Sequence, residues 1–133
     1  MSTLKVATIQ DTSGNNSSTP EQVFQGRAKA WVNFEADGTV AIIDDFNVSS
    51  ITDGGTAIFT VNFTNALANA NYTMTGSSHS YSSDYTGIVV SLSARAGNGN
   101  SIDTKTTTAC KIVTAATTTE VDPVNISVLF FAS

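Results

Sequence analysis

The chain has 133 residues, of which 41% are hydrophobic and only 13% are charged, about half the charged share of an ordinary soluble protein. Its length allows one domain with a single core. The net charge of −5 and the presence of only six Lys and Arg residues argue against a nucleic-acid partner, because phosphate binding needs several basic groups on one face. Ser, Thr and Asn make up roughly a third of the sequence, which suits exposed strand faces and turns.

The first 22 residues differ in character from the rest of the chain. Residues 2–10 place apolar side chains at alternate positions, which predicts a short strand. Residues 11–22 are polar, contain Gly and Pro and show no periodicity, so we expect a linker there. The chain is therefore divided into an arm and linker over 1–22 and a folded domain over 23–133. No stretch has the apolar length of a secretory signal or a membrane span, so membrane insertion is not expected.

Three strands joined by glycine turns are predicted between Gly26 and Phe63. Apolar residues share one face of the first segment and one face of the last: Ala28, Ala30, Val32 and Phe34, then Phe59, Val61 and Phe63. The middle segment is different, because Val40 and Ile42 alternate with further apolar residues on the opposite face. A strand with two apolar faces is buried on both sides. We therefore expect a meander whose central strand is covered twice.

Four further strands are predicted near residues 72–76, 87–93, 104–114 and 125–131. With the earlier segments they give about eight strands at intervals of roughly ten residues, which indicates an all-β, antiparallel, jelly-roll-like β-sandwich. Cys110 is the only cysteine and lies within one of these strands. We expect it to be a small buried hydrophobe, with an interchain or reactive thiol as the alternative.

The last predicted strand suggests an oligomer. Its two faces are both apolar, so Leu129 and Phe131 would remain exposed if only the inner face were packed. A neighbouring subunit would cover them, although a covering loop within a monomer is an alternative. Trp31 also points away from the apolar face of its own strand. We expect Trp31, Leu129 and Phe131 to lie in an interface between subunits.

Several runs of sequence carry a family resemblance. They are STLKVATIQDTSG near the start, FQGRAKAWVNF followed by an acidic glycine turn and DDFNVSSITDGGTAIFTVNFTNALANANYTM, and KTTTACKIVTA with VDPVNISVLFFAS near the end. These runs resemble tail-fibre or virion-appendage proteins of marine bacteriophages, particularly those that infect cyanobacteria. The resemblance implies a β-rich homotrimer, made in the host cytoplasm and carried on the virion. It also implies that residues 1–22 dock onto other virion proteins.

Binding to a host surface is expected at loops within residues 77–103, the part that departs most from the family pattern. Tyrosine offers a rigid apolar face with a hydroxyl, and Ser and Asn add adaptable hydrogen bonding. These properties suit a glycan or a protein surface, although the tyrosines could instead anchor the loop inward. The candidate binding residues are His79, Tyr81, Asp84, Tyr85, Arg95 and Asn98.

Catalysis is not expected. His79 is the only histidine, and its neighbouring Ser and Asp residues do not by themselves form a triad. A metal bound by copies of His79 in an oligomer lacks an identifiable second ligand, so no metal and no cofactor are predicted. Asp44 and Asp45 point to opposite faces of a strand and more naturally mark a bulge or bend. Glu35 and Asp37 lie in a turn, where acidic residues are common.

These observations favour a phage appendage protein that attaches to or recognises the host surface. The alternative is a capsid decoration, cement or head-fibre protein that stabilises the particle. A small glycan-degrading enzyme is the third hypothesis, and it would depend on the carboxylate pairs just described.

Overall fold

The computed structural model describes residues 1–15, 17–79, 89–91, 105–116, 119–120 and 122–133. Over these residues the chain is mostly β, with one short helix and two antiparallel sheets, so the predicted all-β class is confirmed. The elements are α1 (Pro20–Gly26), β1 (Ala30–Glu35), β2 (Ala41–Phe46), β3 (Val48–Asp53), β4 (Ile58–Phe63), β5 (Thr73–His79), β6 (Val89–Ser91), β7 (Ala109–Ala116), β8 (Thr119–Glu120) and β9 (Asn125–Phe131). Within the described ranges, no helix is long and apolar enough to cross a membrane.

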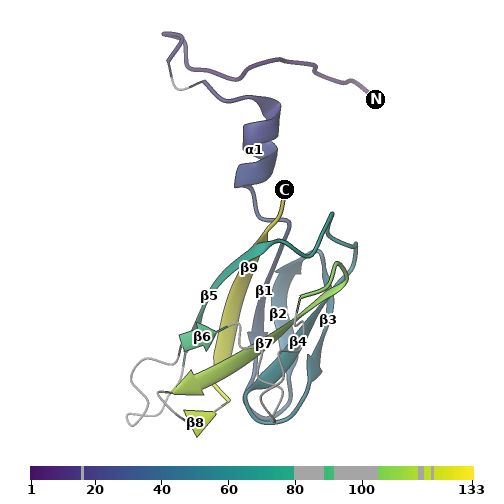
Figure 1. Cartoon of the computed structure of the whole chain (residues 1–133), viewed down its shortest axis with the longest axis vertical. Helices are drawn as coiled ribbons and strands as arrows, with labels where there is room; N and C mark the ends of the chain where they lie inside the picture. Colours follow the sequence, from purple (N-terminus) through teal and green to yellow (C-terminus); the bar gives the residue numbers. More distant parts are fainter. Residues whose placement is uncertain (16, 80–88, 92–104, 117–118, 121) are drawn as a thin grey trace.

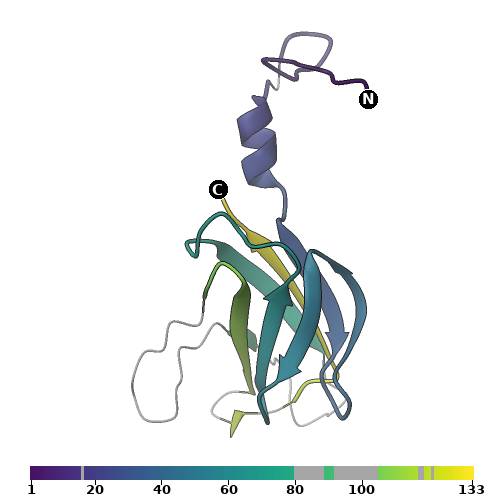
Figure 2. The same ribbon diagram turned by 90° about the vertical axis from the view of Figure 1, so that its right-hand side faces the viewer.

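The strands form two sheets whose order differs from their order in the chain. One sheet has the order β2-β1-β9-β5, and the other has the order β3-β4-β7-β6, with β8 paired to β7 (Figure 1). The last strand, β9, therefore lies in the middle of the first sheet, between β1 and β5. Figure 2 shows helix α1 and the N-terminal segment beyond one end of the sheets.

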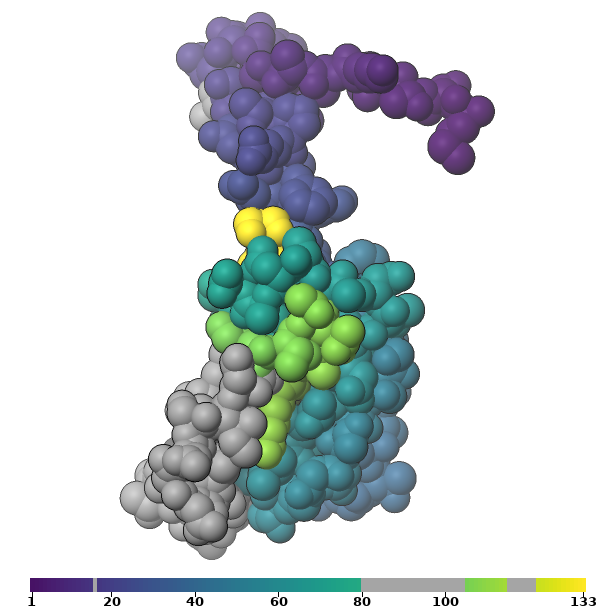
Figure 3. Space-filling model, turned by 45° about the vertical axis from the view of Figure 1, so that its right-hand side comes forward, coloured from purple at the N-terminus to yellow at the C-terminus, as the bar shows by residue number. Residues whose placement is uncertain are grey.

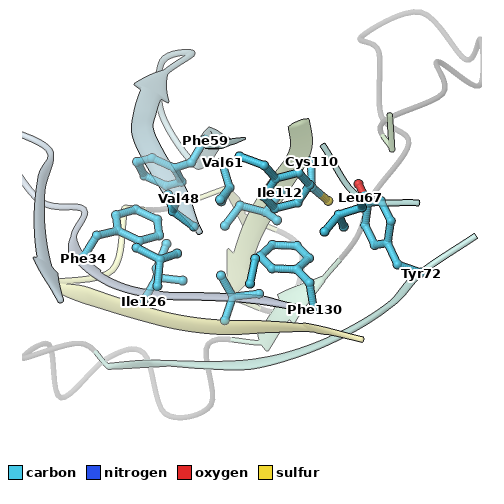
Figure 4. Packing of buried hydrophobic residues seen from close by; sticks show 14 of the residues in the cluster. Phe34, Val48, Phe59, Val61, Leu67, Tyr72, Cys110, Ile112, Ile126 and Phe130 are labelled. Carbon is cyan, nitrogen blue, oxygen red and sulfur yellow. The ribbon is translucent and has the colours of Figure 1, made fainter. Parts of the chain in front are cut away.

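Side chains from both sheets meet in one core. Figure 4 shows Phe34, Ile126 and Phe130 from the first sheet facing Phe59, Val61, Cys110 and Ile112 from the second. The burial alternates along β1, β4 and β9, as the pleat of a strand requires. The predicted apolar faces of the first and last segments are thereby confirmed, apart from Ala28, which is only partly buried. The predicted burial of Cys110 is confirmed as well.

Aromatic rings join the two sheets edge to face. The Phe34 and Phe59 rings have centroids 5.5 Å apart at 66°, and the Phe63 and Phe130 rings have centroids 5.0 Å apart at 80°. Such a pair contributes about 0.5–1.5 kcal/mol beyond the burial of its surface. The Tyr72 ring lies 5.8 Å from that of Phe130, and its hydroxyl donates to the Ala109 carbonyl at 3.1 Å. Tyr72 therefore closes one end of the core without leaving its hydroxyl unpaired.

The predicted three-stranded meander is wrong, because the chain changes sheet after β2. Strand β2 pairs with β1, whereas β3 pairs with β4 in the other sheet. The crossing occurs at Asn47, which has a φ of 58°. Asn adopts this left-handed conformation more readily than most residues other than Gly. Residues 26–63 therefore contribute two hairpins to two different sheets.

The prediction that the middle segment is covered on both faces is also wrong for the single chain. Strand β2 is an edge strand, and Ile43 and Phe46 are 57% and 54% exposed. The pairing with β1 shifts register so that Asn33 lies opposite Asp44 and Phe34 lies opposite Ile42. Ile43 is the extra residue of this bulge, which turns its side chain outward. The predicted bulge is thus confirmed, one residue before the Asp44–Asp45 pair.

The N-terminal region differs from the predicted strand and linker. Residues 2–10 form no strand, and Ile9 makes only an isolated bridge with Ser18 through two hydrogen bonds of 2.8 Å. The Asp11 side chain accepts from the backbone amides of Ser13 and Asn15, which closes the turn between the two bridge partners. The arm is held as a small turn, without a partner strand from either sheet.

Helix α1 occupies the end of the predicted linker and spans the expected boundary between residues 22 and 23. Thr19 and Gln22 form a reciprocal capping box, and Pro20 follows the cap. Both features favour the start of a helix. No residue of α1 is buried, and Figure 3 shows the helix standing away from the strands. The helix forms from its local capping and not from packing onto the core.

Candidate functional site

Of the predicted binding residues, only His79 lies within the described part of the chain. It is the last residue of β5, is exposed, and pairs in register with Asn125 of β9. The other candidates, Tyr81, Asp84, Tyr85, Arg95 and Asn98, lie outside the described residues. Their role in binding therefore stays a prediction.

Asp44 and Asp45, one of the two carboxylate pairs considered for acid–base catalysis, make local hydrogen bonds. Asp44 Oδ1 accepts from the Asp45 amide at 2.9 Å, and Asp45 Oδ2 accepts from the Val48 amide at 3.3 Å. Both bonds lie at the approach to the crossing between the sheets. Across the described ranges, no group of three or more His, Cys, Asp or Glu residues is arranged to hold a metal. The observed role of the Asp pair is to shape the end of β2.

The predicted interface residues share the outer side of the first sheet. Trp31 and Leu129 are opposite one another on β1 and β9, and Phe131 lies two residues further along β9. Leu129 is 37% exposed, and Trp31 and Phe131 are partly buried. These three residues are called the outer apolar face below. A hollow of about 280 Å³ lies over the same two strands, lined by Trp31, Val32, Asn33, Ser127, Val128 and Leu129.

A second hollow lies at the crossing between the two sheets and was not predicted from the sequence. It has a volume of about 330 Å³ and is lined by Lys29, Phe46, Asn47, Thr64 and Asn65. We call it the corner hollow. Its lining residues come from the segment before β1, the end of β2 and the segment after β4, so it depends on contacts between positions far apart in sequence.

Lys29, which lines the corner hollow, also contacts the ring of Phe24 in α1. Lys29 Nζ lies 3.2 Å from the centroid of the Phe24 ring and donates to the Phe24 carbonyl, while Arg27 Cζ lies 4.9 Å from the same ring. The pKa of the Lys29 ammonium is below its usual value because desolvation and, secondarily, the nearby Arg27 charge disfavour the protonated form.

The thiol of Cys110 is buried in the core. Burial raises the pKa of Cys110, and this effect outweighs a hydrogen bond with Tyr72 and the charge of Lys105, which both lower it. A buried thiol with a raised pKa is a poor nucleophile because the reactive thiolate is disfavoured. Cys110 therefore belongs to the core.

Comparison with protein-family models, with curated proteins and with solved structures found no match to this chain.

Proposed function

We propose that this protein is a bacteriophage virion structural protein, a tail-fibre-like appendage that attaches to or recognises the host surface. In this proposal the two sheets form a β-sandwich, and three copies associate through the outer apolar face. Residues 1–22 attach the assembly to other virion proteins. The function requires no cofactor and no catalytic group.

The observation that carries the proposal is the outer apolar face. Trp31 and Leu129 lie side by side on adjacent strands, with their side chains directed away from the core. Apolar side chains that a single chain leaves partly exposed can be covered by a second copy. Covering the 37% of Leu129 that is exposed contributes about 0.5–1 kcal/mol, and a threefold assembly repeats that gain at each interface. This supports association of copies through the outer apolar face.

The N-terminal segment supports attachment to a different partner. Its apolar side chains at Met1, Leu4, Val6 and Ile9 are all exposed, and no residue of α1 is buried. An extended segment with bare apolar side chains can add as a strand to the edge of a partner sheet. The segment also stands clear of the strands, as Figure 3 shows. It therefore leaves the β domain free to project from the particle.

Light scattering on the purified full chain tests the assembly. We expect the mass of three chains, and we expect Leu129→Asp to yield a folded monomer because it places a charge in the interface. Thr39→Asp is the matched control, since it adds the same charge at an exposed turn position. A wild-type monomer that is also absent from purified particles by mass spectrometry would refute the proposal.

A decoration or cement protein would also be present on particles, so a further assay separates the two functions. Particles that lack an appendage protein should adsorb poorly to cells but stay intact. Particles that lack a cement protein should break more easily and still adsorb.

A further inference from the structure

The side chain of Asn47, which lines the corner hollow, is held in place by hydrogen bonds within the protein. Its Nδ2 donates to the carbonyls of Lys29 at 3.1 Å and Asn65 at 3.2 Å. Its Oδ1 accepts from the backbone amide of Asn65 at 2.8 Å and from the Asn65 side chain at 3.1 Å. The Asn47 carbonyl in turn accepts from the Thr64 amide at 3.1 Å. A site fixed in this way loses little entropy when a ligand binds.

Other polar groups of the same hollow are left for a ligand. In the part of the chain that the structure describes, neither the Thr64 hydroxyl nor Asn65 Oδ1 has a hydrogen-bond partner within the protein. A hydroxyl can both donate and accept, and an amide oxygen accepts. Two such groups on consecutive residues suit the neighbouring hydroxyls of a sugar ring.

Phe46 and Lys29 also belong to the lining. Phe46 is 54% exposed at the end of β2 and offers a flat apolar surface. Lys29 uses one of its donors on the Phe24 carbonyl, and an ammonium group has three. Among the residues that the structure describes, those lining the hollow include no carboxylate, although the chain carries a net charge of −5. Lys29 is the one charged residue among the described lining residues, and its positive charge favours an anionic ligand.

We propose that the corner hollow binds one acidic pyranose unit, a hexuronate, of a surface glycan. The apolar face of the sugar ring packs on Phe46, and two ring hydroxyls bond to Thr64 and Asn65. The sugar carboxylate pairs with Lys29. A volume of about 330 Å³ accommodates a single sugar unit and lies at the lower end of the range for ligand sites.

This inference rests on the proposed host-surface function, for which it names a ligand class. It also moves that ligand away from the predicted loops and onto the boundary between the two sheets. Phe46 does not line the hollow over β1 and β9, so sugar binding and association of subunits are assigned to different residues.

The test is a titration of the full-length chain with sodium glucuronate and, separately, with glucose, followed by amide signals in NMR spectra. We expect glucuronate to shift the signals of Lys29, Thr64 and Asn65 with about millimolar affinity. Glucose should bind at least about tenfold more weakly, because it lacks the charge that pairs with Lys29. A longer oligomer of the same uronate should shift the same signals, since the proposed site holds one unit.

Two variants test the charge contact and the ring contact separately. Lys29→Met should reduce glucuronate affinity to that of glucose and leave glucose binding unchanged, whereas Phe46→Ala should weaken both ligands. Lys111→Met is the control, because it removes the same charge from a strand of the other sheet and should change neither affinity. If Phe46→Ala does not fold, Lys29→Met alone still decides the charge assignment.

The proposal is overturned if glucuronate causes no shifts up to roughly 50 mM, or if the shifts lie away from the corner. Equal affinity for glucose and glucuronate, unaffected by Lys29→Met, also overturns it. Light scattering on the same samples tests the proposed trimer separately from sugar binding. A trimer that binds no uronate refutes only this inference, while a wild-type monomer refutes the proposed assembly whatever sugar it binds.

Discussion

Replacement of Asn47 should reveal how much the crossing between the sheets contributes to stability. Its side chain bonds to the segments before β1 and after β4, and its backbone has a φ of 58°. Asn47→Ala loses four partly exposed side-chain hydrogen bonds, each contributing about 0.5 kcal/mol, and places Ala in a conformation that costs it about 1 kcal/mol more than Gly. We therefore expect a loss of about 3 kcal/mol in the free energy of unfolding for Ala and about 2 kcal/mol for Gly.

Urea unfolding with fluorescence detection measures both losses. The dependence of the free energy on urea should remain unchanged, because the substitutions do not alter the surface exposed on unfolding. Asn71→Ala is the control, since Asn71 is an exposed loop residue and such changes usually stay within about 0.5 kcal/mol. The reasoning fails if Asn47→Ala costs no more than this control. If Asn47→Ala and Asn47→Gly lower the free energy of unfolding equally, the left-handed backbone at position 47 costs Ala nothing extra.

Two further predictions concern the strands. An ideal Cβ at Gly76 would lie 2.5 Å from the Ser127 carbonyl oxygen, so Gly76→Ala should separate β5 from β9 and lower the melting temperature by several degrees, while Thr75→Ala should not. Because burial raises the folded-state pKa of Cys110 above 9.0, its contribution to stability is complete below pH 9 and is lost as pH rises toward the folded value. Cys110→Ala should remove that part of the pH dependence, and a thiol reagent should label the wild type only after unfolding. Rapid labelling of the native protein would contradict the burial.

Much of the fold followed from strand periodicity. β1, β4 and β9 alternate in the sequence as they do in the structure, because each has one face on the core and one face outside it. The prediction that β2 is buried on both faces was wrong, because apolar residues at successive positions do not require that both faces be covered. A bulge at Ile43 and a position at the sheet edge leave that side chain exposed, and neither property appears in the periodicity of β2 itself.

The helix was missed although its signal is local. Thr19, Pro20 and Gln22 are the elements of a capped N-terminus, and the polar composition around them favoured a linker instead. The corner hollow had no comparable signal. Asn47 and Asn65 are 18 positions apart, and their contact depends on the chain changing sheets. All of the predicted loop-site residues except His79 lie outside the described residues, so their role in binding stays a prediction.

Electron microscopy of purified particles labelled with antibody against the β domain would show where this chain lies on the virion. We expect label on projecting appendages, with the epitopes of the β domain accessible on the intact particle. Label spread evenly over the capsid would contradict the appendage function in favour of decoration. Particles that carry no label, from a phage that encodes this chain, would contradict the assignment to the virion.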